Sequence, residues 1–252
     1  MHSRIIHVVM REVRGSSPRD AGAEMFVAEA GISGTIGGGR LEYIVTLAAR
    51  EMLAAEEAAR HLDQPLGPEI GQCCGGRVEL DLTLMSAEDK ARVEARLRAA
   101  QDAQPHVYVM GAGHVGRALA DLMQFLPVRC ILVDSREGEL SQVCADVETR
   151  LMALPEHDIV TAPAGSGFII LTHEHSLDFL LASEALKRGD AAYVGLIGSR
   201  SKRAKFRNFC TKECDGLSID DLICPIGAGG SRDKRPSVIA ASVVAEVMAA
   251  VL

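Results

Sequence analysis

The sequence predicts an α/β protein whose parallel-sheet domain lies C-terminal to a smaller α+β domain. From residue 106 onwards, short apolar runs alternate with amphipathic helical runs, which is typical of a parallel sheet covered by helices. Before residue 105 this alternation is missing, and a charged stretch at residues 96–104 ends at Pro105. The chain is therefore expected to divide into residues 1–104 and 105–252.

The N-terminal block mixes strand patterns with one long helical pattern. Its strand candidates are residues 5–10, 25–28 and 78–85, the last of which alternates apolar and acidic side chains. Residues 41–61 are rich in Ala, Leu, Met and Glu at helical spacing, and they predict a single long helix. Ser86 and Asp89 then form a capping-box-like pair, which predicts the start of another helix.

The C-terminal block predicts alternating strands and helices. The expected strands are residues 107–110, 128–133, 168–171 and 193–196, with a weaker candidate near 150–153. The expected helices are residues 115–125, 177–188, 201–214 and 236–251. Ligands of such sheets bind at the carboxyl ends of the strands, so the polar motifs that follow strands are the candidate sites.

The stretch at residues 106–116 reads H-V-Y-V-M-G-A-G-H-V-G and predicts a Rossmann-like phosphate-binding turn. Gly111 allows the tight turn, Gly113 allows the close approach of a phosphate, and Gly116 lets the helix pack on the strand. Asp134 ends the next predicted strand, roughly 20 residues further on, where an acidic side chain can accept hydrogen bonds from a ribose. The alternative is a turn that only closes the fold and binds nothing.

A second motif, T-H-E-H-S-L-D at residues 172–178, follows another apolar run. His173 and His175 would point the same way if the strand continued, and Asp178 could return to them from the first turn of a helix. Two histidines and a carboxylate are able to bind a divalent metal or to transfer protons. The other interpretation is that a hydroxyl side chain caps the helix while the histidines only form hydrogen bonds.

A third motif combines Gly198, Ser199 and Arg200 at the start of a predicted helix with a basic first half. A helix N-terminus with a serine beside it can bind an anion. Basic side chains on an exposed helix are more often only solvated, so this motif also has a structural interpretation.

Two adjacent cysteines, Cys73 and Cys74, lie in the run G-Q-C-C-G-G-R. Their spacing does not match the C-x-x-C of zinc or thioredoxin-type sites. A thiol in a glycine loop beside Arg77 is expected to have a lowered pKa and to act as a nucleophile or soft ligand. The alternative is a small packing residue. Cys130 lies inside an apolar run and is expected to be a buried, neutral thiol.

The composition argues against several classes of protein. Lys and Arg number 27 against 34 Asp and Glu, and the net charge of −7 argues against general nucleic-acid binding. No apolar run reaches the length of a membrane span, and Glu246 interrupts the apolar C-terminal run. Seven cysteines without a secretory signal predict a cytoplasmic protein with free thiols. We also expect a homodimer, because two predicted helices offer surplus apolar surface and two-fold dimers are common.

Several motifs, in the same order along nearly the whole chain, resemble the xanthine dehydrogenase accessory proteins of the XdhC/CoxI family. They are R-G-S-S-P-R-D-A-G-A at residues 14–23, G-T-I-G-G-G-R-L-E at 34–42, G-Q-C-C-G-G-R at 71–77, G-A-G-H-V-G at 111–116, V-D-S-R at 133–136, T-H-E-H-S-L-D at 172–178 and G-L-I-G-S-R at 195–200. The sequence departs from the family pattern after Gly227, where Ala228 replaces a leucine.

The resemblance implies a carrier rather than a turnover enzyme. Members of the family bind the molybdenum cofactor, as molybdopterin or its cytosine dinucleotide form, assist its sulfuration, protect it and insert it into an apo molybdenum hydroxylase such as xanthine dehydrogenase. The implied partners are that hydroxylase, a cysteine desulfurase and the proteins of molybdenum cofactor biosynthesis. The residues expected to bind the cofactor are Gly111, Gly113, His114, Gly116, Asp134, Arg136, Cys73, Cys74, His173, His175, Gly198, Ser199 and Arg200.

Two other functions stay open from the sequence. An NAD(P)-dependent oxidoreductase would use Asp134 to bind a ribose and His173 or His175 as proton donor. A metal-dependent enzyme would be built on the two histidines and Asp178. Nicotinamide turnover distinguishes the first from a carrier, and metal content distinguishes the second.

Overall fold

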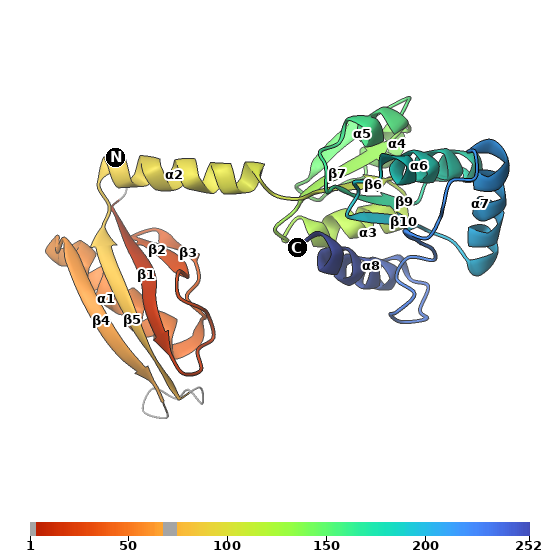
Figure 1. The fold of residues 1–252 in the computed structure, drawn as a ribbon. Coiled ribbons are helices and arrows are strands. Elements are labelled where there is room, and N and C mark those ends of the chain that lie inside the picture. The colour runs from red at the N-terminus through yellow and green to blue at the C-terminus, as the bar shows by residue number, and fades with distance from the viewer. Residues whose placement is uncertain (1–3, 68–74) are drawn as a thin grey trace. The chain divides into compact units, whose positions relative to one another are not determined.

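The computed structural model describes residues 4–67 and 75–252 (Figure 1). The chain forms two compact units, Met1–Arg98 and Ala99–Leu252. The boundary between them falls inside helix α2 (Ala87–Asp102), none of whose 16 described residues is buried. Each unit is accordingly described by its own sheet and core.

The N-terminal unit is an antiparallel sheet in the order β3-β2-β1-β5-β4, with one helix against it. The strands are β1 (Ile5–Arg14), β2 (Glu24–Ala28), β3 (Gly31–Gly34), β4 (Ala59–Leu66) and β5 (Gly76–Leu84). Along β1, Ile6, Val8 and Met10 are fully buried, whereas the side chains between them are partly exposed. The buried side chains pack with Leu41 of α1 (Gly39–Ala55), so the alternation in the sequence reflects a sheet with one covered face.

The helix predicted at residues 41–61 is wrong in its C-terminal part, which forms a strand. α1 ends at Ala55, and Glu56 adopts a left-handed conformation with φ 54°. β4 then pairs antiparallel with β5 at the edge of the sheet. Only Leu62 and Leu66 of β4 pack into the core, so its largely polar sequence gave no clear strand pattern. The strand β3 was not predicted either, because all four of its residues are exposed and give no alternating pattern.

The predicted capping pair at the start of α2 is confirmed. Ser86 Oγ accepts a hydrogen bond from the Asp89 N–H at 3.1 Å, and Asp89 Oδ2 accepts one from the Ser86 N–H at 3.0 Å. These bonds satisfy donors that the first turn of a helix leaves without intrahelical partners.

The C-terminal unit is a parallel sheet in the order β11-β10-β9-β6-β7-β8. The strands are β6 (His106–Met110), β7 (Arg129–Asp134), β8 (Glu148–Leu151), β9 (Gly167–Ile170), β10 (Tyr193–Leu196) and β11 (Leu222–Ile223). The strand order reverses between β6 and β9, the point at which doubly wound sheets bind their ligands. The prediction of a Rossmann-like domain C-terminal to a smaller α+β domain is confirmed.

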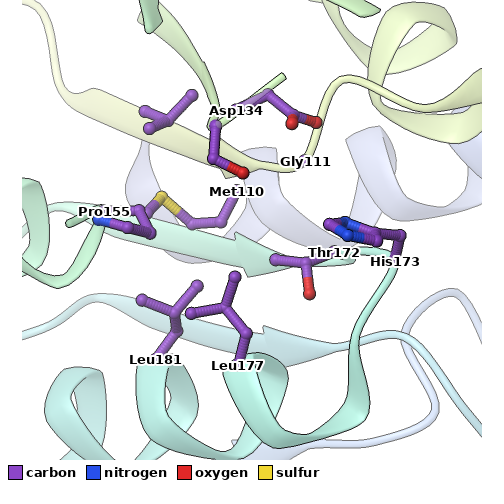
Figure 2. A pocket seen from close by; sticks show the side chains of 10 residues that line it. Met110, Gly111, Asp134, Pro155, Thr172, His173, Leu177 and Leu181 are labelled. Carbon is purple, nitrogen blue, oxygen red and sulfur yellow. The ribbon is translucent and has the colours of Figure 1, made fainter. Parts of the chain in front are cut away.

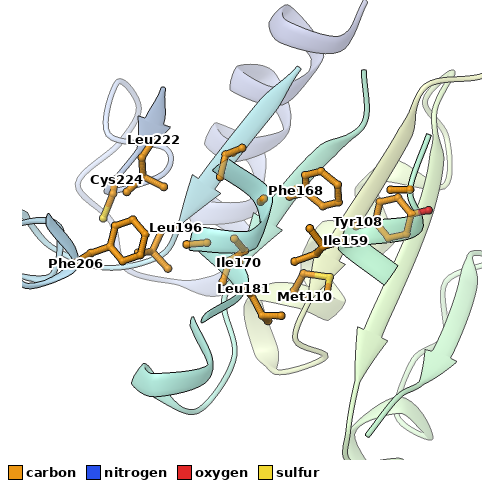
Figure 3. Close-up of a cluster of buried hydrophobic side chains, with 14 of the residues drawn as sticks. Tyr108, Met110, Ile159, Phe168, Ile170, Leu181, Leu196, Phe206, Leu222 and Cys224 are labelled. Carbon is orange, nitrogen blue, oxygen red and sulfur yellow. The ribbon is translucent and has the colours of Figure 1, made fainter. Parts of the chain in front are cut away.

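Helices cover both faces of the parallel sheet. They are α3 (His114–Met123), α4 (Glu137–Leu140), α5 (Glu156–Thr161), α6 (His175–Arg188), α7 (Arg200–Glu213) and α8 (Pro236–Val251). α3 and α8 lie against one face, and α5 and α6 lie against the other (Figure 1). Tyr108 and Phe168 pack into the core beneath α5 and α6 (Figure 3), whereas Val107 and Ile169 pack into the opposite one. Because both faces are buried, the central strands read as continuous apolar runs.

The apolar C-terminal run is the packed helix α8. Val243 and Val247 are fully buried, and Glu246 accepts a hydrogen bond from the Tyr193 hydroxyl at 2.6 Å. Among the described helices, none combines the length and the apolar character that crossing a membrane requires.

Candidate functional site

The carboxyl edge of the parallel sheet brings three of the predicted motifs together. Backbone hydrogen bonds continue beyond the strand ends, from the Gly111 N–H to Val133 O at 2.7 Å and from the Leu171 N–H to Met110 O at 3.0 Å. The glycine turn after β6, the T-H-E-H segment after β9 and the turn after β10 therefore lie along the same edge. This edge is where the topology predicts ligand binding.

Two of the three glycines in the turn after β6 are required by packing within the protein. Gly111 has φ 130°, and a Cβ atom there would lie 2.5 Å from the Leu171 carbonyl oxygen. A Cβ atom on Gly116 would lie 1.9 Å from the carbonyl oxygen of Gly111. Both distances are far shorter than a van der Waals contact, so the tight turn and the close helix packing both require glycine.

The third glycine, Gly113, is not required by the protein itself. It has an ordinary φ of −67°, and within the described residues no atom lies within 4 Å of the place a Cβ would occupy. Gly113 is the N-cap of α3, so the first N–H groups of that helix open onto the same space. His114, the first residue of the helix, is exposed there. The open space fits the approach of an anionic group to the backbone.

Asp134 stabilises the glycine turn through hydrogen bonds. Its carboxylate accepts from the Ala112 N–H at 2.7 Å, from the Arg136 N–H at 2.9 Å, and from the Arg136 guanidinium at 3.0 and 2.9 Å. Burial raises the pKa of Asp134, but the hydrogen bonds from Arg136 and Ala112 outweigh burial and hold it below its usual value. Both carboxylate oxygens are occupied, so a ribose would have to displace Arg136.

A narrow pocket lies between the glycine turn and the end of β9. Figure 2 shows Gly111 and Asp134 on one side, with Thr172 and His173 on the other. Its volume is only about 10 Å³, the space that a single water molecule needs. This pocket is too small for a phosphate, whereas the outer side of the turn is open at Gly113.

The prediction that Asp178 joins His173 and His175 is wrong. Asp178 is buried, and its Oδ1 accepts hydrogen bonds from the Thr172 N–H and hydroxyl, both at 2.8 Å. Its Oδ2 accepts from Lys202 Nζ at 2.5 Å. The strand ends at Ile170, and both histidines are exposed on the segment that follows. Both carboxylate oxygens of Asp178 are therefore bonded to Thr172 and Lys202 rather than to the histidines.

Lys202 is the residue of this edge that sequence reasoning missed. Its side chain is only 11% exposed, because its stem lies across Gly198, where a Cβ would approach Lys202 Cδ to 2.6 Å. Ser199 is the N-cap of α7 and accepts a hydrogen bond from the Lys202 N–H at 3.2 Å, and Arg200 is exposed in the first turn. A glycine four residues before a lysine at a helix start was the available signal.

Comparisons with known proteins agree with this arrangement. Residues 107–247 match the family model of the XdhC Rossmann domain, and residues 2–63 match that of the XdhC and CoxI family. The chain belongs to the XdhC/CoxI family.

Two relatives place this XdhC-family chain among known proteins. It is 24% identical over 243 residues to the uncharacterized protein YqeB of Escherichia coli (strain K12). That match covers 93% of the chain but 41% of YqeB, so the chain spans about two fifths of this relative. A crystal structure described as a xanthine dehydrogenase from Bacillus halodurans superposes with a TM-score of 0.81 at 18% identity, covering 98% of this chain and 91% of that one. At this identity the similarity establishes the fold.

The remaining chemistry of this XdhC-family chain concerns metals and thiols. Across residues 4–67 and 75–252, no group of three or more His, Cys, Asp or Glu side chains is arranged to hold a metal ion. Burial raises the pKa of Cys130 to about 12, which confirms the expected neutral thiol. Cys224 is buried near the turn after β10, with Sγ 3.9 Å from Ser199 O. The predicted role of Cys73 and Cys74 lies outside the described residues.

Proposed function

We propose that this chain is a molybdenum cofactor carrier that assists sulfuration of the cofactor, protects it and inserts it into an apo molybdenum hydroxylase such as xanthine dehydrogenase. Membership of the XdhC/CoxI family supports this proposal. The observation that carries the binding step is the open backbone at Gly113, between two glycines that packing already explains.

The residues at the sheet edge fit the phosphate of such a cofactor. Molybdopterin and its cytosine dinucleotide form both bear phosphate, and the N-terminus of α3 presents free N–H groups beside Gly113. His114 adds a polar side chain at this position, and Arg136 lies behind the turn on Asp134. When bound, the cofactor would supply the molybdenum centre that the hydroxylase requires, while this chain binds and orients it.

The partners follow from the same proposal. The carrier would meet a cysteine desulfurase and the proteins of molybdenum cofactor biosynthesis before it meets the apo hydroxylase. A homodimer is part of the proposal, and light scattering that gave the mass of a single chain at micromolar concentration would contradict it.

The NAD(P)-dependent oxidoreductase is disfavoured by the state of Asp134. In enzymes that bind NAD through such a turn, the acidic residue after the second strand receives a ribose hydroxyl. Here that carboxylate is saturated by Ala112 and Arg136. Titration with NADH and NADPH, followed by a turnover assay, tests this alternative directly.

Replacing Gly113 with valine tests the cofactor site. A Cβ atom at this position meets no atom within 4 Å beyond the neighbouring residues of the chain, so the fold should remain intact while the branched side chain fills the space in front of the helix N-terminus. The molybdenum and pterin retained per chain should fall about tenfold or more, because charge-assisted hydrogen bonds to the phosphate are lost. Gly31→Val is the matched control, since Gly31 is equally open and lies in the N-terminal unit. A folded Gly113→Val protein that retains cofactor as well as the wild type would rule out this site.

A further inference from the structure

A second and much larger pocket opens at the ends of β9 and β10. Its volume is about 570 Å³, and Thr172 lines both this pocket and the narrow one beside the glycine turn. We call it the β9–β10 pocket. Its other lining residues are His175, Phe179, Ile197, Gly198, Ser199, Ser201, Lys202 and Lys205. The two pockets are therefore neighbours, and Thr172 of the loop after β9 lines both of them.

One wall of the β9–β10 pocket is apolar and fixed in place. Phe179 of α6 packs against the rings of Phe206 and Phe209, with ring centroids 5.2 and 5.6 Å apart. Ile197 continues this wall from the end of β10. Rings held in such a cluster provide a flat, rigid surface, against which a planar ring can stack.

A second part of the lining, contributed by α7, is positively charged. The charge of Lys202 is neutralised by the buried carboxylate of Asp178. Lys205, one turn further along α7, is exposed and forms no ion pair with any described residue. The described lining contains no carboxylate, and both α6 and α7 begin at the pocket. The positive ends of these two helices add to the charge of Lys205.

We propose that the β9–β10 pocket binds a planar heteroaromatic ring with an anionic substituent, the ring stacking against Phe179 and the anion pairing with Lys205. This inference rests on the proposed function, because the ring would belong to the ligand whose phosphate lies at the glycine turn. Both places lie along the carboxyl edge of the same sheet, after β6 and after β9 and β10. Lys202 is a positioning residue, since its pairing with Asp178 holds the start of α7 against the loop after β9.

The experiment uses 6-carboxypterin, a fluorescent pterin ring that carries one carboxylate, as the probe of the intact chain. The wild type should bind it, and Lys205→Glu should weaken binding about tenfold or more, because an attractive charge becomes a repulsive one. Lys212→Glu is the matched control, since Lys212 lies in the last turn of the same helix outside the pocket. Its affinity should equal that of the wild type. Both lysines are exposed, so both variants should fold.

Gly113→Val separates this pocket from the glycine turn, and this variant should bind the probe like the wild type. The inference is overturned if the folded wild type does not bind the probe at millimolar concentration, or if Lys205→Glu binds it unchanged. If the wild type does not bind the probe but Gly113→Val still loses the molybdenum cofactor, the pocket is rejected and the proposed function stands. Probe binding with no cofactor retention by the wild type would reject the carrier and keep the pocket.

Discussion

At the scale of single residues, the glycines of the turn after β6 have separable roles. A Cβ on Gly116 would overlap the carbonyl oxygen of Gly111, so Gly116→Ala must push α3 away from the strand. We expect this substitution to lower the free energy of unfolding by about 1–3 kcal/mol, the usual cost of overpacking. Gly113→Ala is the matched control and should stay within about 0.5 kcal/mol of the wild type. Urea unfolding measures both, and equal losses would show that packing, not ligand access, selects glycine at both positions.

The sequence could predict the glycine turn but not the side chains that close the site. Gly111 and Gly116 are required by the tight turn and the close packing of α3, and this requirement can be recognised from a few consecutive residues. The pairing of Asp178 with Lys202 joins residues 24 positions apart, near the starts of α6 and α7, the helices that follow two different strands. Only the strand order brings those helix starts together, so the motif at residues 172–178 suggested the nearby histidines instead.

At the scale of elements, burial on both faces decided which parts could be predicted. The central strands β6, β7, β9 and β10 are apolar except at some of their ends because helices cover both sides, and their sequences predicted them. β4 lies at the edge of a sheet with one covered face, where polar side chains are tolerated. The helical pattern of α1, which ends shortly before β4, was therefore extended into the residues of β4. The short elements α4, α5 and β11 give too few residues for a period to be recognised.

Two histidines at strand positions predict opposite responses to pH. Burial lowers the pKa of His106 at the start of β6, with Arg129 adding to the effect. On acidification the unfolded chain gains this proton first, near pH 6.5, so stability from neutral His106 is lost as the pH falls. The hydrogen bond that His61 on β4 donates to the Asp81 carboxylate raises the pKa of His61, so its contribution is present at low pH and lost as the pH rises.

Thermal unfolding at pH 5.5 and 7.5 tests this difference. His106→Phe should reduce the loss of stability on acidification, because the residue that resists protonation is gone. His61→Gln should cost more stability at pH 5.5 than at pH 7.5. The assignment of these histidines fails if both variants keep the pH dependence of the wild type.

At the scale of the whole molecule, the two units have separate cores. The buried residues of the N-terminal unit form one cluster between its sheet and α1, and those of the C-terminal unit form two clusters on the faces of the parallel sheet. The unit boundary falls in α2, none of whose described residues is buried. The alternation of apolar runs predicted the C-terminal fold, whereas the strand order came only from the structure, because pairing depends on contacts distant in sequence.

Separate cores predict separate unfolding. Calorimetry of the whole chain should show two transitions, one for each unit. Leu80→Ala removes a fully buried side chain from the N-terminal core, and Ile169→Ala does the same in the C-terminal unit. Each should lower its own transition, with a loss of about 2–5 kcal/mol, and leave the other unchanged. A single transition that both variants lower equally would mean that the units fold as one cooperative body, and that α2 transmits stability between them despite having no buried residue along its described length.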